Sequence, residues 1–265
     1  MNIFLHELKA NRKSTIIWTL SLVAVVIFFM ALFPSITKDA EGFKKVLENY
    51  PEGVRKVLGV SINSITSLLG FYSYVFTYVV LCGAIQAMNL GTSILSKEVR
   101  EKTADFLLTK PITRVQIVTA KLLSAFTSLV LSNVVFIAAA IITVKAVSGK
   151  TFDMTAFLLI SLTAFWVECL FLALGILISV TLPKIKSVLS VSLGTVFGFF
   201  VLNMLGSVIG EKAIRYVTPF KYYDTTYIMK HNSYETTYVI IEILFIMAAV
   251  TVSYLIYSKK DIHAV

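Results

Sequence analysis

Residues 154–183 read MTAFLLISLTAFWVECLFLALGILISVTLP and carry a single charge, that of Glu168. An α-helix needs about 20 consecutive apolar residues to cross the hydrocarbon core of a bilayer. A run of this length and composition therefore predicts a membrane-spanning helix. The fold class of the chain then depends on how often the pattern recurs.

The pattern recurs in both directions along the 265-residue chain. Charged side chains are absent from residues 14–37, 122–144 and 187–210, and residues 236–258 contain only Glu242. The uncharged stretch 57–96 begins with many Ser, Thr and Asn residues, so we expect one span in its second part. The sequence predicts an all-α integral membrane protein with six transmembrane helices in a single domain, residues 1–265. The spans are expected at about 15–35, 69–95, 114–144, 155–181, 187–209 and 237–257.

The overall composition agrees with a lipid environment. Hydrophobic residues make up 57% and charged residues 15% of the chain, whereas an ordinary soluble domain has about 45–50% and about 25%. Disordered chains are poor in aromatic and bulky aliphatic residues, so this class is also excluded. The net charge of +9 could suit nucleic acid, but the chain has no groove-reading motif. We therefore expect the lipid bilayer, and no nucleic acid, as a partner.

The distribution of Lys and Arg indicates the orientation. Six spans place both termini on one side of the membrane, and the segments on that side hold 13 Lys and Arg among 51 residues. The opposite segments hold 11 among 70. Because cytoplasmic loops carry an excess of these residues, we expect both termini in the cytoplasm.

Two segments outside the spans are amphipathic. The apolar residues of 2–13 fall on one side of a helix, which predicts an N-terminal interfacial helix on the inner membrane surface. Residues 41–58 show the same spacing, interrupted by Pro51 and Gly53. This interruption predicts two short outer helices resting on the membrane.

The segment 97–121, KEVREKTADFLLTKPITRVQIVTAK, is the most informative part of the predicted inner surface. Residues 97–108 fit an amphipathic helix, and Pro111 ends it because the residue before a proline is pushed out of the α region. Thr113 and Gln116 have the spacing of a capping box that starts the next span. From these residues alone, the segment is either a solvated hairpin or an element on which a cytoplasmic partner acts.

This segment resembles the first cytoplasmic loop of ABC-2 type permeases, the membrane subunits of ATP-driven exporters. The family loop has an acidic residue, a Gly-Thr pair, a Leu-Leu pair, Pro-Ile/Val-Ser-Arg and a Lys that begins the next span. Lys102 replaces the usual Gly and Thr113 the usual Ser. Four other stretches also resemble the family: the N-terminal segment, YPEGVRKVLG at 50–59, TPFKYYD at 218–224 and the KKDI tail at 259–262. The matching loop residues are Glu98, Thr103, Leu107, Leu108, Pro111, Ile112, Arg114 and Lys121.

The resemblance implies that the loop is a coupling helix seated in a separate cytoplasmic ABC ATPase subunit. Two ATPase copies and a second permease copy would complete the assembly. The charged face of Arg100, Glu101 and Asp105 would contact the ATPase, with Phe106 and Leu107 filling its groove. ATP and Mg²⁺ would bind the partner subunit, so no cofactor and no catalytic residue are expected in this chain.

Glu168 lies near the middle of its span, where a carboxylate costs about 2.5–3.5 kcal/mol on translocon scales. It either belongs to a substrate path or proton relay, or is a protonated side chain bonded to a polar neighbour. The candidate neighbours are Gln86, Asn133 and Asn203. Glu242 is about two turns into the last span, where it could extend to the membrane surface, and no role is assigned to it.

Two other patterns lie in and after the fifth span. Its GxxxG spacings, a weak signal of close helix approach, predict a packing or dimer face at Gly194, Gly198, Gly206 and Gly210. The following aromatic residues predict a belt at the lipid headgroups. The family resemblance implies in addition that they form an outer gate of short re-entrant helices. The belt residues are Tyr216, Pro219, Phe220, Tyr222 and Tyr223.

The chain lacks the patterns of several other classes. No GxxxxGK[ST] phosphate loop and no HExxH metal motif occurs, so we expect no ATPase activity and no metal site. The predicted function is the permease subunit of an ABC exporter that moves a hydrophobic or amphipathic substrate, such as a peptide. A stand-alone secondary transporter or channel and a non-transporting membrane anchor or sensor for an ATPase remain alternatives.

Overall fold

The computed structural model describes residues 3–57, 59, 62, 64–100, 113–148, 151–182, 184–209 and 212–259. All regular structure in these residues is helical. Six helices are long and apolar enough to cross a membrane, which confirms the predicted fold class. They are α1 (Ile3–Lys38), α4 (Leu68–Arg100), α6 (Arg114–Val147), α7 (Met154–Thr181), α8 (Val188–Ile209) and α11 (Thr236–Lys259).

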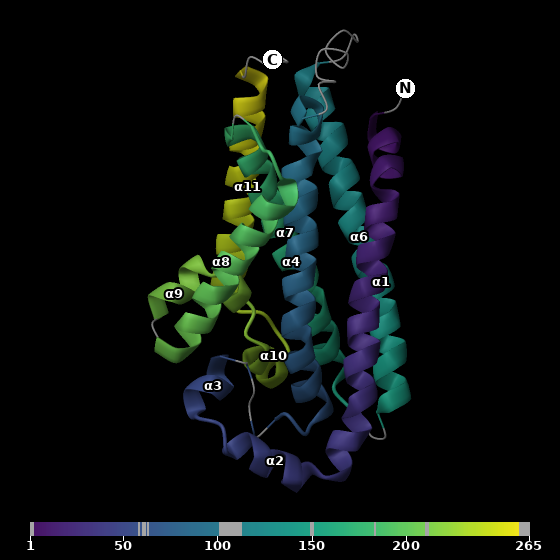
Figure 1. Cartoon of the computed structure of the whole chain (residues 1–265), viewed down its shortest axis with the longest axis vertical. Coiled ribbons are helices and arrows are strands. Elements are labelled where there is room, and N and C mark those ends of the chain that lie inside the picture. Colours follow the sequence, from purple (N-terminus) through teal and green to yellow (C-terminus); the bar gives the residue numbers. More distant parts are fainter. Residues whose placement is uncertain are drawn as a thin grey trace.

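The remaining helices are short. Residues Ala40–Glu48 form α2 and Glu52–Val57 form α3, with Pro51 between them as expected. After α8 follow α9 (Lys212–Val217), a 3₁₀ turn η1 (Pro219–Lys221) and α10 (Thr225–His231). Figure 1 shows α2, α3 and α10 at one end of the bundle, whereas α1 begins and α11 ends at the other. The two chain ends therefore lie on the same side, as an even number of spans requires.

The centre of the bundle is the pair α4 and α7 (Figure 1). In each of them 61% of the most apolar 18 residues are buried within the chain, against 17% in α11 and 22% in α8. Two glycines allow the backbones to approach. A Cβ atom at Gly175 would lie 2.8 Å from the Met88 oxygen and 2.9 Å from the Thr92 nitrogen, and one at Gly91 would overlap the Leu172 oxygen. Only glycine fits this contact, because its lack of a side chain lets helices pack backbone to backbone.

The other four long helices surround this pair. α1 packs mainly along α6 and also touches α4, α11 packs on α7, and α8 packs on α4. The buried face of α1 carries Leu22, Val26, Met30 and Phe33 at helical spacing. The opposite face exposes large apolar side chains such as Ile17 and Phe28, which suits contact with lipid rather than water.

The expected N-terminal interfacial helix was wrong as a separate element. Residues 3–13 are the first turns of the 36-residue α1 and continue into the span without a break. Their amphipathic pattern has another cause, because Glu7 is buried and pairs with Lys121 of α6. The polar side of this segment partly faces a neighbouring helix, which periodicity alone does not distinguish from a water-facing side.

Alanine substitutions at two glycines are expected to have opposite effects on stability. Gly175→Ala forces α4 and α7 apart, and overpacking of this kind costs about 1–3 kcal/mol. Gly53→Ala in α3 meets no atom within 4 Å, and Ala favours a helix over Gly by about 1 kcal/mol, so this control should be neutral or stabilising. Thermal unfolding of the purified chain in detergent measures both. Equal melting temperatures for the two variants would contradict the close α4–α7 contact.

Candidate functional site

The expected coupling helix lies mostly outside the described residues. The backbone of α4 is described up to Arg100, but the side chains of Glu98 and Arg100 are not. The next described residue is Thr113. The other coupling residues outside the described part of the chain are Glu101, Thr103, Asp105, Phe106, Leu107, Leu108 and Pro111. Their contacts with an ATPase therefore stay a prediction.

The start of α6 fixes the point where the chain re-enters the bundle. Thr113 and Gln116 form the predicted capping box, in which the backbone amide of Gln116 donates to Thr113 Oγ1 at 3.2 Å. The Thr113 amide donates in return to Gln116 Oε1 at 3.0 Å. Arg114 donates from Nη1 to the Ser258 carbonyl at 3.4 Å. The first turn of α6 is thus tied to the last turn of α11.

A buried ion pair joins three helices at the end of the bundle where α6 begins and α11 ends. Lys121 of α6 is fully buried, and its Nζ donates to Glu7 Oε1 of α1 at 2.9 Å. The same Nζ donates to the carbonyl of Ile94 in α4 at 2.8 Å. Breaking such a pair by removing one partner costs about 3–5 kcal/mol because a charge is left buried. The link therefore holds α1, α4 and α6 together less than two turns from the last described residue of α4.

A second polar contact lies deeper in the bundle, around Glu168 of α7. Asn133 of α6 donates from Nδ2 to Glu168 Oε2 at 2.6 Å. The other carboxylate oxygen lies against Gly83 of α4, where a Cβ atom would collide with it. Glu168 is only 1% exposed. This enclosure and the direct bond favour the interpretation of Glu168 as a structural group that joins α4, α6 and α7.

Gln86 extends this polar contact to α1. Its Nε2 donates to Ser132 Oγ at 3.5 Å, and Ser132 Oγ lies 2.8 Å from Thr19 Oγ1 of α1. Ser132 precedes Asn133 on α6, so the two contacts are adjacent. Asn133 therefore bonds directly to Glu168, whereas Gln86 bonds to Ser132, and together these side chains link α1, α4, α6 and α7.

Asn203, the third candidate, lies elsewhere. It lines a small cavity of about 50 Å³ together with Phe220 and Tyr223. Within the described part of the chain its Oδ1 has no hydrogen-bond partner. Of the alternative neighbours of Glu168, Asn203 is therefore not the one that bonds to it among the described residues, because α8 places it beside the segment between α8 and α11.

Glu242 is also placed differently from the expectation. Instead of extending to the membrane surface it is 0% exposed, and Tyr223 donates from Oη to its Oε2 at 2.6 Å. Burial is the main cause that raises the pKa of Tyr223 above the usual tyrosine range, and the nearby Glu242 carboxylate raises it further. The phenol therefore stays protonated and donates to the carboxylate, which anchors the segment before α11 to the bundle.

The predicted aromatic belt is only partly on the surface. Tyr216 is 51% exposed, but Pro219, Tyr222 and Tyr223 are buried. Phe220 packs between Phe171 of α7 and Phe200 of α8, with ring centroids 5.4 and 5.6 Å away. This packing turns the segment inward, as a gate of re-entrant helices would require.

Arg215 of α9 holds the segment in this position. It pairs with Glu235, donates from Nε to the Lys221 carbonyl at 3.0 Å and lies 4.0 Å from the ring centre of Tyr238. The last interaction is a cation–π contact with α11. Arg215 therefore joins α9, η1 and the start of α11.

A further link connects α10 to the start of α7. Asn232, in a left-handed conformation with φ of 50°, caps α10 and donates from Nδ2 to Asp153 Oδ2 at 2.8 Å. Asp153 in turn accepts from the Thr155 and Ala156 amides as the N-cap of α7. The hydrogen bond from Asn232 and the one from the Ala156 amide lower the pKa of Asp153. The carboxylate thus stays charged and keeps both helices joined.

The candidate packing glycines divide into two groups. At Gly206 an added Cβ would lie 2.7 Å from Ile214 Cγ2, so this glycine lets α9 turn back along α8. At Gly194 and Gly198 nothing lies within 4 Å, so within the described residues they are not used for packing. Gly210 lies outside the described residues.

Comparison with known proteins agrees with this arrangement. A family model described as an ABC-2 family transporter protein matches residues 1–262. The chain belongs to the ABC-2 transporter family. A search of curated proteins finds no match.

Family membership makes the chain a multi-pass permease subunit that works with a separate ABC ATPase. The permease is not itself catalytic, and ATP binds the partner subunit. A stand-alone secondary transporter or channel is thereby excluded. In the described residues no group of three or more His, Cys, Asp or Glu could hold a metal ion.

Sequence reasoning missed several residues that position the site. Gly83, Gly91 and Gly175 have no GxxxG spacing, but Ala87 lies four residues from both Gly83 and Gly91, and this small-xxx-small pattern could have identified that face of α4. Glu7 and Lys121 were both visible as charges at span ends. Nothing in their spacing of 114 positions indicated that they form a pair.

The buried pair makes a stability prediction for the permease. Lys121→Met leaves the Glu7 carboxylate without its main partner and should cost about 3–5 kcal/mol of unfolding free energy. Adding Glu7→Leu should recover most of this loss. Lys145→Met, at an exposed position of α6, is the control and should change stability by less than about 0.5 kcal/mol. Denaturant unfolding in detergent measures all three, and a Lys121→Met variant as stable as the control would refute the pair.

Glu168 gives a second prediction. In Glu168→Gln the new carbonyl can still accept from Asn133, so folding and ATP-coupled transport should both stay within about twofold of the parent. Glu168→Leu strands the Asn133 amide and should cost about 1–3 kcal/mol, whereas adding Asn133→Leu should largely restore stability. A folded Glu168→Gln variant that no longer transports would instead show that the carboxylate serves the substrate path.

Proposed function

We propose that this permease exports a hydrophobic or amphipathic substrate, such as a peptide, across the cytoplasmic membrane of a prokaryote. Two cytoplasmic ABC ATPase subunits would dock on the side where both termini lie. This side carries the larger share of Lys and Arg, which supports a cytoplasmic position.

The observation that carries the proposal is the Glu7–Lys121–Ile94 link. It joins α1, α4 and α6 next to the two helix ends that flank residues 101–112, the expected coupling segment. A displacement of that segment would act on α4 and α6 directly. Because Lys121 holds these helices to α1, the three would move together rather than slide past one another.

The motion would reach the opposite end through the central pair. α4 is packed against α7 at Gly91 and Gly175, and α7 contacts the outer segment through Phe171 and Phe220. This path supports a gate formed by η1 and its neighbouring helices. Substrate would leave where these aromatic side chains close the bundle.

We also propose that two permease copies form the substrate path between them. Gly194 and Gly198 face open space on α8, whose most apolar stretch is only 22% buried in the single chain. Small residues at helical spacing allow close helix association in membranes. A second copy, or a paralogue, would cover this face, and the apolar, aromatic helices would suit a hydrophobic cargo.

The function is tested on the permease purified with its ATPase and reconstituted in vesicles. The double variant Glu101→Lys, Phe106→Asp should lose at least about tenfold of ATPase binding and all coupled transport, because it changes the expected contact face. The control is Glu48→Lys, Val46→Asp, which makes the same changes on exposed residues of α2 at the other end and should preserve both activities.

The same vesicles test the substrate class. Amphipathic peptides should stimulate ATP hydrolysis and accumulate on the far side, whereas small polar solutes should not. No ATPase copurifying with the chain, or full coupling in the first double variant, would refute the proposed docking. ATPase binding without flux of any compound would favour the membrane anchor or sensor.

A further inference from the structure

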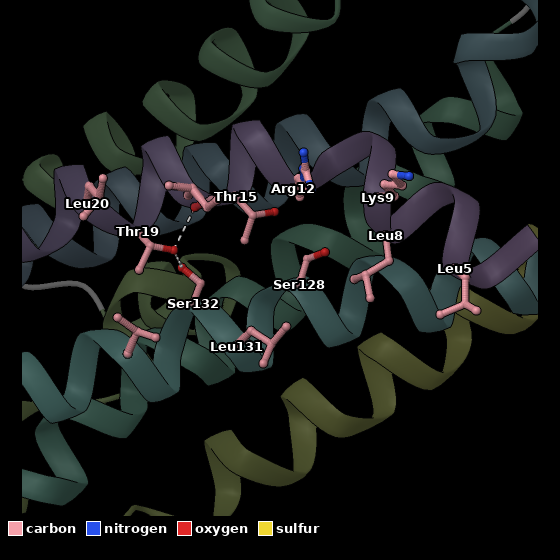
Figure 2. A pocket seen from close by; sticks show the side chains of 12 residues that line it. Leu5, Leu8, Lys9, Arg12, Thr15, Thr19, Leu20, Ser128, Leu131 and Ser132 are labelled. Atoms are coloured by element: carbon pink, nitrogen blue, oxygen red, sulfur yellow. Dashed lines mark hydrogen bonds between the residues drawn. The ribbon is translucent and has the colours of Figure 1, made fainter.

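A groove runs along the outside of the bundle between α1 and α6 (Figure 2), on the side of the chain termini. Its volume is about 650 Å³. In Figure 2, Lys9 and Arg12 stand on the α1 side, and Ser128 and Leu131 stand across from them on α6. The groove is therefore open to the region where lipid would surround the protein.

The lining of the groove is suited to a hydrocarbon chain. Ile16, Leu20, Leu131 and Val135 line it with apolar side chains. Its hydroxyl groups are already bonded within the protein: Thr15 donates to the Asn11 carbonyl, Ser128 donates to the Ser124 carbonyl, and Thr19 and Ser132 bond to each other. A ligand that lay here would gain apolar contacts and would not need to replace these hydrogen bonds.

Two cations stand beside this apolar surface. Lys9 and Arg12 line the groove and are exposed, and neither pairs with a carboxylate among the described residues. Glu7, the acidic residue of α1 nearest to them, is paired with Lys121 instead. Within the described part of the chain, the positive charge at this part of the groove is therefore not neutralised.

The distance along α1 between the cations and the apolar part of the groove matches the thickness of one leaflet of a bilayer. Residues 14–37 of α1 carry no charge, so Arg12 lies just outside the apolar span. At about 1.5 Å per residue, Arg12 and Leu20 are about 12 Å apart along α1. One leaflet contributes about 15 Å of hydrocarbon, so a headgroup near Arg12 would place an acyl chain along Leu20.

We propose that this groove is a binding site for an anionic phospholipid of the leaflet on the side of the termini. The phosphate binds Lys9 and Arg12, and one acyl chain lies along Leu20, Leu131 and Val135. Basic pockets between transmembrane helices bind anionic headgroups in this way. The lipid holds α1 against α6 next to the Glu7–Lys121 pair, and its binding is independent of any exported cargo.

The charge requirement is tested by native mass spectrometry of the full chain. The probes are phosphatidylglycerol and phosphatidylcholine with identical acyl chains, and phosphatidylglycerol should bind at least about tenfold more tightly. The variant Lys9→Gln, Arg12→Gln should weaken it about fivefold for each charge removed, because each cation near an anionic surface contributes about 1 kcal/mol. Lys44→Gln, Lys45→Gln removes two charges from α2 at the far end and should leave binding unchanged.

The groove itself is tested by filling it. Leu131→Trp and Leu123→Trp change two leucines of α6 that are each 52% exposed, but only Leu131 lines the groove. Leu131→Trp should lower phosphatidylglycerol binding at least fivefold, and Leu123→Trp should not. Equal binding of both lipids, equal losses in a variant and its control, or a chain dimer that Leu131→Trp dissociates without changing lipid affinity would overturn the proposal.

Discussion

The close contact between α4 and α7 is the constraint on which the rest of the permease depends. In lipid, helices gain little by hiding apolar surface from one another, so association relies on van der Waals packing and on hydrogen bonds between helices. Gly91 and Gly175 let the two backbones meet directly. The resulting pair is the most enclosed part of the bundle, and α1, α6, α8 and α11 pack around it. The approach also brings Gly83 against Glu168, so the same contact encloses the intramembrane carboxylate.

Polar side chains then select one arrangement of the surrounding helices. An apolar helix face can slide or rotate at little cost, whereas a buried polar group without a partner is expensive. Lys121 meets Glu7 and Ile94 only when α1, α4 and α6 are in register. Glu168 and Glu242 act similarly, one bonded to Asn133 within the bundle and the other to Tyr223 of the segment between α8 and α11. The three contacts span 114, 35 and 19 positions of the sequence, and each joins side chains of different elements.

Much of the fold could be predicted because it depends on local properties. Hydropathy identified the long helices, Pro51 the break between α2 and α3, and Thr113 with Gln116 the start of α6. The predictions that were wrong concern which neighbouring group buries a polar side chain. The pattern of residues 3–13 suggested a membrane surface where the structure has α6, and Glu242 was expected at the surface where Tyr223 encloses it.

The candidate site also has parts that could be predicted from the sequence and parts that could not. Family motifs in residues 98–121 predict where an ATPase would dock, because they lie in one short continuous segment that sequence can identify. Sequence alone was enough to predict the number and approximate position of the long helices, the cap at the start of α6 and the placement of both termini on one side. Only the tertiary structure decided which glycines pack, which charges pair and where the groove between α1 and α6 opens. Helix formation and membrane insertion depend on neighbouring residues, whereas these features depend on side chains brought together across as many as 114 positions.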